Sequence, residues 1–514
     1  MKTKGDVLVL GSGVAGLRFA IYVAEQRPDL SVLVLTKTVL PDSNSNFAQG
    51  GIAAVTDFKS DSFESHIQDT LKSGGGKSSP WVVSHVVKSA PDRIHDLIKL
   101  GLRFTETEEG KLDMALEGGH TKPRVIHCLD HTGEEVIQVL LKKVNSLPNI
   151  TCFENMYCMD LIQTISNRIG GVTAFDKKQK KIVHFQAKLV MLATGGCGQV
   201  YKYTTNPSVA TGDGVSLGIK KGALVSNLQY IQFHPSALFE SDKQRLDLIT
   251  EAIRGFGAYV VNDEGRRFLF EYDKKGELAT RDVVSKAIFS ELKKRGINHV
   301  YLDFRHLSYE PLKKHFPTII ANLQSKGFDV KQDLIPIVPA AHYQCGGLVV
   351  NERGQTNLNG LYAIGECADS GLHGVNRLAS NSLLEALVFA HDSAEYICGI
   401  IDEIQHEPCL KSNIAVPKLT SDELIKSLIK RMRETMSNYA TIASDLVDVK
   451  WAKSRFDVYK KLLNQQQRNS GISESSLIAE NCLMMSCAII EGLLNQLQKK
   501  IPINRLKKSS PIHR

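Results

Sequence analysis

The sequence predicts an α/β fold with several domains, and three observations support this prediction. An apolar run at residues 7–10 leads directly into a glycine-rich turn and then a helix. With 514 residues, the chain is too long for a single hydrophobic core. Beyond residue 421 the apolar residues recur at helical spacing. We therefore expect a Rossmann-like nucleotide-binding domain, an inserted α+β domain and a C-terminal helical domain.

The first 37 residues have the layout of a dinucleotide-binding βαβ unit. A strand, the turn GSGVAG, a helix at 17–26 and a second strand at 31–35 follow one another. The first glycine permits a tight turn, the second lets backbone N–H groups approach a pyrophosphate, and the third allows helix–strand contact. The second strand ends in Thr-Lys, without the acid that usually holds a ribose hydroxyl, so FAD and NAD(P) both remain possible. The predicted cofactor residues of this unit are Gly11, Ser12, Gly13, Val14, Ala15, Gly16 and Lys37.

Composition limits the class of protein. The chain is 42% hydrophobic and 23% charged, as is usual for a soluble globular protein. We expect no transmembrane helix and no signal peptide, and hence a cytoplasmic protein. The ten cysteines contain no CxxC pair, which predicts reduced thiols and no metal site. Much of the net charge of +8 lies in a basic stretch at 499–514, which we interpret as a solvated tail and not as a nucleic-acid site.

A loop rich in Ser and Asn follows the nucleotide-binding unit. Its small residues and its Gln-Gly-Gly end would let backbone N–H groups contact an anion or a flavin ring. An ordinary polar turn is the equal alternative. The candidate cofactor residues are Asn44, Ser45, Asn46, Phe47, Ala48, Gln49, Gly50 and Gly51.

Helices are predicted at residues 61–71, 80–100 and 134–144. A polar segment lies between the second and the third of them. Glu117, His120 and Arg124 are close together in it, among glycines. They would suit a pocket for a zwitterionic or anionic ligand, although a local surface salt bridge explains them equally well. Further on, a strand runs into the turn ATGG. Asp213 lies in a glycine turn before a helix at 215–221, either as a cap or as a cofactor contact.

A late strand decides the cofactor. It ends in Gly-Glu at Glu366, and a helix then opens near Ser382 and Leu383. This arrangement places an acid on a ribitol or ribose and backbone N–H groups on a flavin carbonyl. NAD-dependent dehydrogenases have no such second half, so we predict FAD.

The predicted domains are residues 1–237 and 337–410 for the FAD-binding domain, 238–336 for a capping domain over the flavin, and 421–514 for the helical domain with its tail. Residues 262–268 are expected to form a hairpin in the capping domain, and residues 411–421 a linker.

Ten motifs in one order resemble the succinate dehydrogenase/fumarate reductase flavoprotein family, over roughly residues 5–400, and within it the members that oxidise aspartate. The motifs are GSGVAGL, AQGGIAAV, EGGH, ATGG, FHPSAL, TEAIRG, RDVV, PAAHYQCGG, YAIGE and GLHGVNRLASNSLLEAL. The resemblance implies an FAD domain, a capping domain inserted into it, and a C-terminal helical domain.

The resemblance also implies roles for single residues. His234 and Thr250 would hold one carboxylate of a dicarboxylate, and His342 with Arg377 the other. Arg281 matches the arginine that the family uses for proton transfer. Because arginine is normally protonated, it is poorly suited to act as a base, and we expect it to act as a proton donor to fumarate or as an electrostatic clamp.

Two residues distinguish the expected activity from succinate oxidation. Asn44 stands where the succinate and fumarate enzymes carry a histidine linked to FAD, so non-covalent FAD is expected. Glu117 would face the α-ammonium of aspartate, with Arg254 beside it to limit its field. The C-terminal region departs from the family: residues 491–494 read EGLL where an arginine–glycine–histidine stretch is usual.

The implied reaction is oxidation of L-aspartate to iminoaspartate with O2 or fumarate as acceptor, with a quinolinate synthase as the next enzyme in NAD biosynthesis. A soluble fumarate reductase or succinate-oxidising flavoprotein is the main alternative. A flavin-binding sensor or scaffold, with its tail on nucleic acid or a membrane, is the second.

Overall fold

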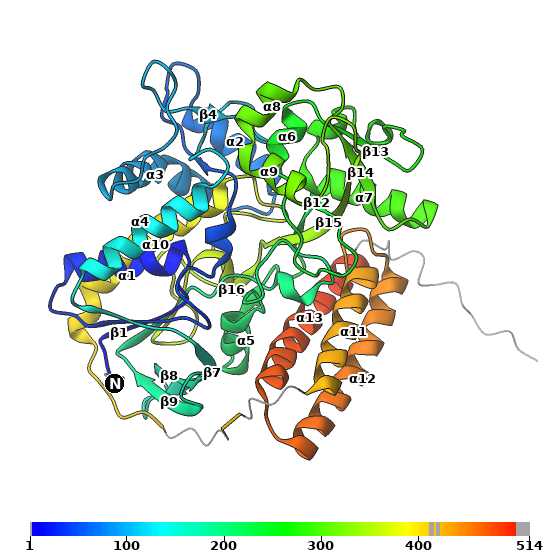
Figure 1. The fold of residues 1–514 in the computed structure, drawn as a ribbon. Coiled ribbons are helices and arrows are strands. Elements are labelled where there is room, and N and C mark those ends of the chain that lie inside the picture. Colours follow the sequence, from blue (N-terminus) through cyan, green and yellow to red (C-terminus); the bar gives the residue numbers. More distant parts are fainter. Residues whose placement is uncertain (1–2, 411–415, 418–421, 500–514) are drawn as a thin grey trace, which may run out of the picture.

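A computed structural model describes residues 3–410, 416–417 and 422–499 (Figure 1). The expected linker falls largely outside the described residues, and so does the basic tail beyond Lys499. At the centre lies a parallel five-stranded sheet in the order β17-β10-β1-β2-β6. Its strands are β1 (Val7–Leu10), β2 (Val32–Leu35), β6 (Ile150–Phe153), β10 (Leu189–Leu192) and β17 (Leu361–Ala363).

The two faces of this sheet are covered differently. Successive side chains of β1 alternate: Val7 and Val9 pack against helices, and Leu8 and Leu10 pack against a second sheet. The helices are α1 (Val14–Gln26), α3 (Pro80–Lys99), α4 (Thr132–Ser146) and α10 (Asn381–Ile400). The second, antiparallel sheet consists of β7 (Met156–Gln163), β8 (Ile169–Asp176) and β9 (Lys181–Gln186). Shorter elements of this half are β3 (Ile52–Ala53), β4 (Met114–Ala115), β5 (Val125–Ile126), α2 (Phe63–Ser73), α5 (Asp213–Lys220), β11 (Val225–Ser226), β16 (Gly347–Val349) and β18 (Ala368–Asp369).

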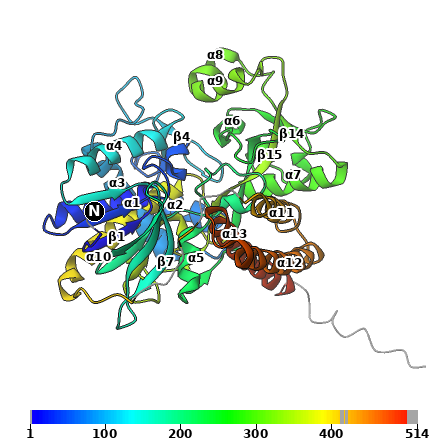
Figure 2. The same cartoon turned by 60° about the horizontal axis from the view of Figure 1, so that its bottom comes forward.

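The inserted segment has its own sheet and core. Its antiparallel strands follow the order β12-β15-β14-β13, and Val260, Ile288, Leu302 and Ile337 are buried in its core. Figure 2 shows this segment as a separate lobe beside the first one. The strands are β12 (Ile231–Leu238), β13 (Tyr259–Val261), β14 (Val300–Asp303) and β15 (Ile335–Gln344), and the helices are α6 (Glu251–Gly255), α7 (Arg281–Arg295), α8 (Tyr309–His315) and α9 (Pro317–Ser325).

The expected hairpin at 262–268 is wrong. The turn exists, since the N–H of Gly265 donates to the carbonyl of Asn262 at 3.0 Å. No second strand follows the turn, because β13 pairs with β14, about 40 residues further along. A short 3₁₀ helix (Leu269–Glu271) takes the place of the expected strand.

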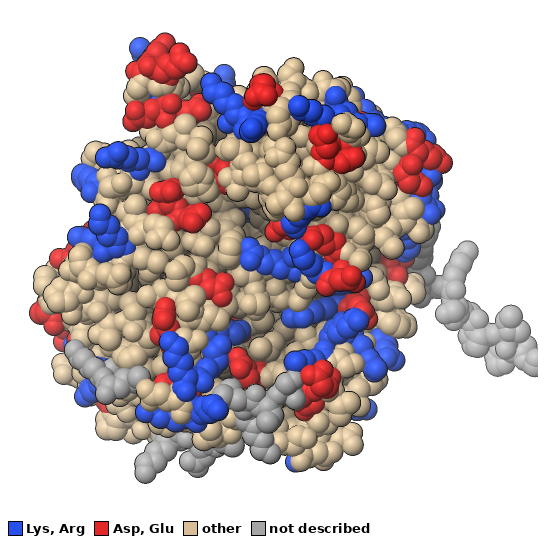
Figure 3. Space-filling model, in the orientation of Figure 1, with Lys and Arg blue, Asp and Glu red and all other residues tan. Residues whose placement is uncertain are grey.

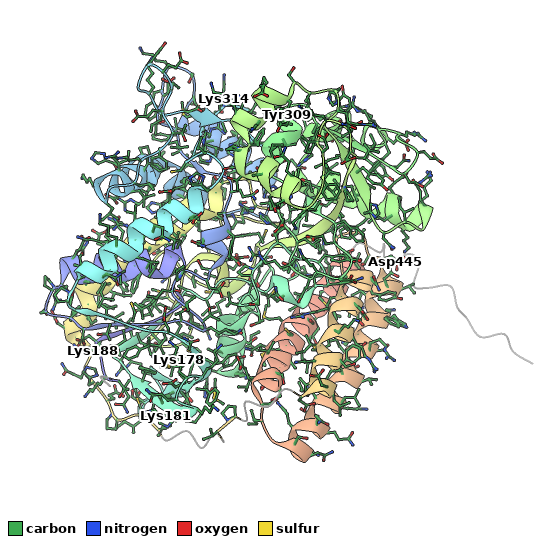
Figure 4. The ribbon with its side chains drawn as sticks, viewed as in Figure 1. Lys178, Lys181, Lys188, Tyr309, Lys314 and Asp445 are labelled. Atoms are coloured by element: carbon green, nitrogen blue, oxygen red, sulfur yellow. The ribbon has the colours of Figure 1, made fainter. Side chains whose placement is uncertain are left out.

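The C-terminal residues form a bundle of three helices, α11 (Glu423–Tyr439), α12 (Leu446–Ser470) and α13 (Glu474–Lys499). Asp445, labelled in Figure 4, starts α12 with a capping box and accepts the N–H of Asp448 at 2.9 Å. The bundle shares a core with β7 and α5, in which Met436, Phe456 and Met485 are buried.

Two expectations about the whole chain can be compared with this fold. Among the described helices, α13 alone is long and apolar enough to span a membrane by length and composition, where none was expected. Its apolar residues pack inside the bundle, as in the core helix of a globular domain. All ten cysteines are free thiols, as predicted.

On the face drawn in Figure 3, basic and acidic side chains are interspersed.

Candidate active site

The glycine turn packs closely against the end of β10. Gly11 has φ of +115°, and a β-carbon there would lie 2.1 Å from the carbonyl oxygen of Ala193. At Gly16 a β-carbon would lie 2.1 Å from the carbonyl oxygen of Gly11. Side chains are therefore excluded at both positions, which is the tight turn and close approach expected from the motif.

One pocket extends from this turn to the surface of the inserted segment. It brings together predicted residues that are hundreds of positions apart in sequence. Gly16, Asn46 and Arg254 are not among its lining residues. The predicted residues that line it are Gly11, Ser12, Gly13, Val14, Ala15, Lys37, Asn44, Ser45, Phe47, Ala48, Gln49, Gly50, Gly51, Asp213, Glu366, Ser382 and Leu383 for the cofactor, and Glu117, His234, Thr250, Arg281, His342 and Arg377 for the substrate.

The Ser/Asn-rich loop presents polar atoms to the pocket. Residues 44–47 form a short 3₁₀ helix, and Asn44 donates to Glu366 Oε2 at 2.9 Å. The side-chain oxygens of Asn44 and Gln49 are buried and have no hydrogen-bond partner among the described residues. Buried amide oxygens are normally satisfied by a donor. These residues therefore fit a polar ligand such as FAD.

Asp213 forms an ion pair at the other side of the glycine turn. It is the first residue of α5, but its side chain does not cap that helix. Its Oδ2 lies 2.9 Å from Lys37 Nζ, and both residues line the pocket. Of the two roles considered for Asp213, this geometry favours the one at the cofactor pocket.

Two arginines meet in the inserted segment's end of the pocket. Arg281 Nη1 and Arg377 Nη2 both donate to Gln232 Oε1, at 3.2 and 2.9 Å. Arg281 begins α7, whereas Arg377 lies in the loop before α10. Burial lowers the pKa of Arg377 to about 10, so it remains charged at neutral pH. A shared acceptor thus fixes two cationic groups side by side, as an anionic ligand requires.

A buried histidine, His234, and a half-buried one, His342, complete this end. The rings of His234 and His342 lie 5.2 Å apart between centroids, and Thr205 Oγ1 is 2.7 Å from His342 Nδ1. Burial, together with Arg281 nearby, holds the pKa of both histidines well below the usual range. Neutral imidazoles can donate hydrogen bonds to a carboxylate without further charge repulsion between cations.

Glu251 links Arg281 to Arg254. Its Oε2 lies 2.6 Å from Arg281 Nε and its Oε1 lies 3.0 Å from Arg254 Nη2. Burial raises the pKa of Glu251, but the two guanidinium groups outweigh it and the pKa lies below its usual value. Arg254 Nη1 also donates to the backbone carbonyl of Glu277. The side-chain carboxylate of Glu277 in turn pairs with Arg267 at 2.8 Å. A series of hydrogen bonds and ion pairs thus leads from the pocket to the half-exposed Arg267.

Among the described residues Arg254 forms no ion pair with Glu117, beside which it was expected; its partner is Glu251. Helix α6 places Arg254 three residues after Glu251 on the same face, so the two pair with each other. The Glu251 carboxylate also lies against the backbone of Gly118, where a β-carbon would be 1.8 Å from Glu251 Oε1. Arg254 acts on Glu251 instead of Glu117.

Glu117 lies between the Ser/Asn-rich loop and the start of α10. Its Oε2 accepts the hydroxyl of Ser380 at 2.6 Å, and its Oε1 would be 2.8 Å from a β-carbon on Gly50. Ser380 has φ of +61°, a left-handed conformation that turns its hydroxyl toward the pocket side. Burial raises the pKa of Glu117 because the charged form loses its water, and the nearby Glu251 carboxylate acts in the same direction. Arg281, the Ser380 hydroxyl and Arg377 lower the pKa but do not outweigh burial. A cationic ligand group would stabilise its charged form.

Comparison with known proteins identifies the family. A family model described as an FAD binding domain matches residues 6–383. An L-aspartate oxidase of Acinetobacter baylyi is 36% identical and covers 96% of this chain and 92% of its own length. One of Yersinia pestis is 38% identical and covers 96% and 94%. The chain belongs to the L-aspartate oxidase family. The predicted flavoprotein enzyme is thereby confirmed.

Solved structures agree with the predicted fold of this L-aspartate oxidase family member. A quinol fumarate reductase of E. coli is 27% identical, with a TM-score of 0.85 over 96% of this chain and 88% of that one. A Mycobacterium smegmatis protein titled Sdh1 is 28% identical, with a TM-score of 0.81 over 96% and 87%. The resemblance to the succinate dehydrogenase/fumarate reductase flavoproteins is confirmed.

Sequence reasoning missed four polar residues that the structure places at the substrate end. Gln232 and Glu251 hold the arginines, Thr205 holds His342, and Ser380 holds Glu117. Three of them lie in or directly before a quoted motif: Glu251 is in TEAIRG, Ser380 is in GLHGVNRLASNSLLEAL, and Gln232 precedes FHPSAL. Their position in or beside these motifs could have identified them as site residues.

Proposed function

We propose that the protein oxidises L-aspartate to iminoaspartate with FAD, and transfers the electrons to O2 or fumarate. One observation carries this proposal: a single pocket is lined by two arginines fixed by Gln232 and by a buried carboxylate at Glu117. Paired cations suit a dicarboxylate. An additional acid suits the ammonium that aspartate has and succinate lacks.

The substrate would be held at both ends. Arg377 with His342 would take one carboxylate and His234 with Thr250 the other, since all four line the pocket. A planar guanidinium can bind a carboxylate through two hydrogen bonds. Fixing both ends orients the Cα–H bond, and such orientation is worth up to about 7–11 kcal/mol of barrier.

Glu117 would bind the α-ammonium and could accept its proton. Amine oxidation is favoured by a neutral amine, and a carboxyl with a raised pKa is suited to take a proton from it. Bound FAD supplies the hydride acceptor. The products balance as iminoaspartate with H2O2 when O2 is the acceptor, or with succinate when it is fumarate.

Arg281 would act as an electrostatic clamp during aspartate oxidation and as a proton donor during fumarate reduction. Glu251 lies 2.6 Å from Arg281, and Arg254 lies 3.0 Å from Glu251. These two residues would return the proton to Arg281. Iminoaspartate hydrolyses in water, so we also propose that a quinolinate synthase consumes it in the cytoplasm, in NAD biosynthesis.

Anaerobic mixing of the FAD-loaded protein with substrate tests this function. L-aspartate should bleach the oxidised flavin, because Glu117 accommodates its ammonium, and succinate should bleach it far more slowly. Absorbance near the flavin maximum reports the reaction. Bleaching by succinate and not by L-aspartate would support the alternative, a succinate-oxidising flavoprotein or soluble fumarate reductase.

We also propose that FAD is bound without a covalent link, since the asparagine at position 44 offers no nucleophilic ring nitrogen. Acid precipitation should therefore leave the yellow flavin in the supernatant. Flavin retained in the protein pellet would contradict this.

A further inference from the structure

The cofactor pocket also contains the ion pair of Lys37 and Asp213. Lys37 follows β2, where dinucleotide-binding folds usually place an acid on the adenosine ribose. The acid here comes from a different element, α5, and lies 2.9 Å from Lys37 Nζ. Lys37 Nζ also donates to Thr211 Oγ1 at 2.6 Å, and it lies 5.0 Å from the ring centre of Tyr157.

A residue of the C-terminal bundle holds this acid from behind. Asn481, in the second turn of α13, donates from Nδ2 to Asp213 Oδ1 at 2.8 Å and to the Tyr157 hydroxyl at 3.0 Å. Asn481 is only 5% exposed and is not among the lining residues of the pocket. It therefore contacts Asp213 on the side away from the cofactor pocket.

Helix α13 also packs against the turn that carries Asp213. Gly212 has φ of +74°, and a β-carbon there would lie 2.4 Å from Met485 Cγ. Two ion pairs lie at the edge of the same contact, Lys220 with Glu480 at 2.9 Å and Lys177 with Glu474 at 3.3 Å. Helix α13 thus contacts the backbone of this turn at Gly212 and its side chain at Asp213.

We propose that α13 is part of the cofactor site, with Asn481 as a positioning residue that fixes the Asp213 carboxylate for the adenosine half of FAD. Without Asn481, Asp213 Oδ1 loses its buried amide donor, and the Thr211 hydroxyl at Oδ1 and Lys37 at Oδ2 alone orient the carboxylate among the described residues. The inference rests on the assignment of FAD to this pocket, and it is independent of which substrate the enzyme oxidises.

Titration of the full-length apoprotein with FAD, followed by flavin fluorescence, tests this. N481A should raise the Kd for FAD by about tenfold, the usual effect of losing a hydrogen bond to a charged group. N495A, on an exposed position of the same helix, is the matched control and should leave the Kd unchanged. N481S serves as the milder variant if N481A does not fold.

A double-mutant cycle separates positioning from a general loss of stability. If Asn481 acts through Asp213, N481A should have little further effect in a D213A background. An unchanged Kd in folded N481A or N481S would overturn the inference, and so would equal losses in both backgrounds. Oxidation of L-aspartate by the wild-type protein is measured separately, so failure of the proposed function would be recognised independently of this result.

Discussion

Replacing Arg281 by leucine is expected to lower kcat for L-aspartate oxidation and for fumarate reduction by roughly 10²- to 10⁴-fold, the range for a positioned acid–base group. The Arg281 side chain contacts Gln232, which fixes Arg377, and it also lies 2.6 Å from Glu251. Its loss removes a charge from the pocket and leaves Glu251 with Arg254 alone. Stopped-flow flavin reduction gives the rate directly.

The R281L variant has a matched control on its own helix. Arg295 pairs with Asp263 near the surface, and R295L should keep wild-type kinetics. R281K keeps the charge but not the planar group, so an intermediate rate is expected. R281L with nearly wild-type reduction rates would show that Arg281 lies outside the chemistry.

Replacing Glu117 by glutamine should lower kcat/KM for L-aspartate by roughly 10- to 100-fold, the cost of losing a charge-assisted hydrogen bond. Glutamine can still accept the Ser380 hydroxyl, so the local structure is kept. Fumarate reduction should change little, because fumarate has no ammonium. Equal losses with aspartate and fumarate would show that Glu117 does not recognise the amino group. E109Q, on an exposed residue of the same segment, is the control.

The same variant should change the pH profile. Because burial raises the pKa of Glu117, its carboxyl is protonated at pH values where an ordinary glutamate is charged. In the wild-type protein, kcat/KM for aspartate should therefore fall on the acid side, starting from a higher pH than an ordinary glutamate would give. In E117Q this acidic limb should disappear, and its persistence would assign the limb to another group.

Local patterns predicted the elements that depend on nearby residues. The apolar run at Val7–Leu10 and the glycine turn after it define β1 and α1, because burial on both faces and the tight turn involve neighbouring positions. The helix expected at 80–100 is observed as α3, Pro80–Lys99, with Ser79 as its cap.

Long-range pairing was less predictable. Strand β13 pairs with β14 and not with the residues across the adjacent turn, so the hairpin predicted from the local sequence was wrong. Arg254 was expected beside Glu117, but it lies three residues after Glu251 on helix α6 and forms its ion pair with Glu251. Asn481 and Asp213 are 268 positions apart, and no short-range signal connects them. These contacts follow from how the lobes pack.

The central claim is that one pocket holds a flavin and a dicarboxylate, with Glu117 at the amino group of the substrate. A crystal structure of the FAD-loaded protein with a bound dicarboxylate amino acid tests it most directly. We predict that Arg377 binds one carboxylate, that Arg281 lies over the Cα–Cβ bond, and that Glu117 contacts the ammonium. A ligand bound with Glu117, Arg281 and Arg377 all turned away from it would contradict the account.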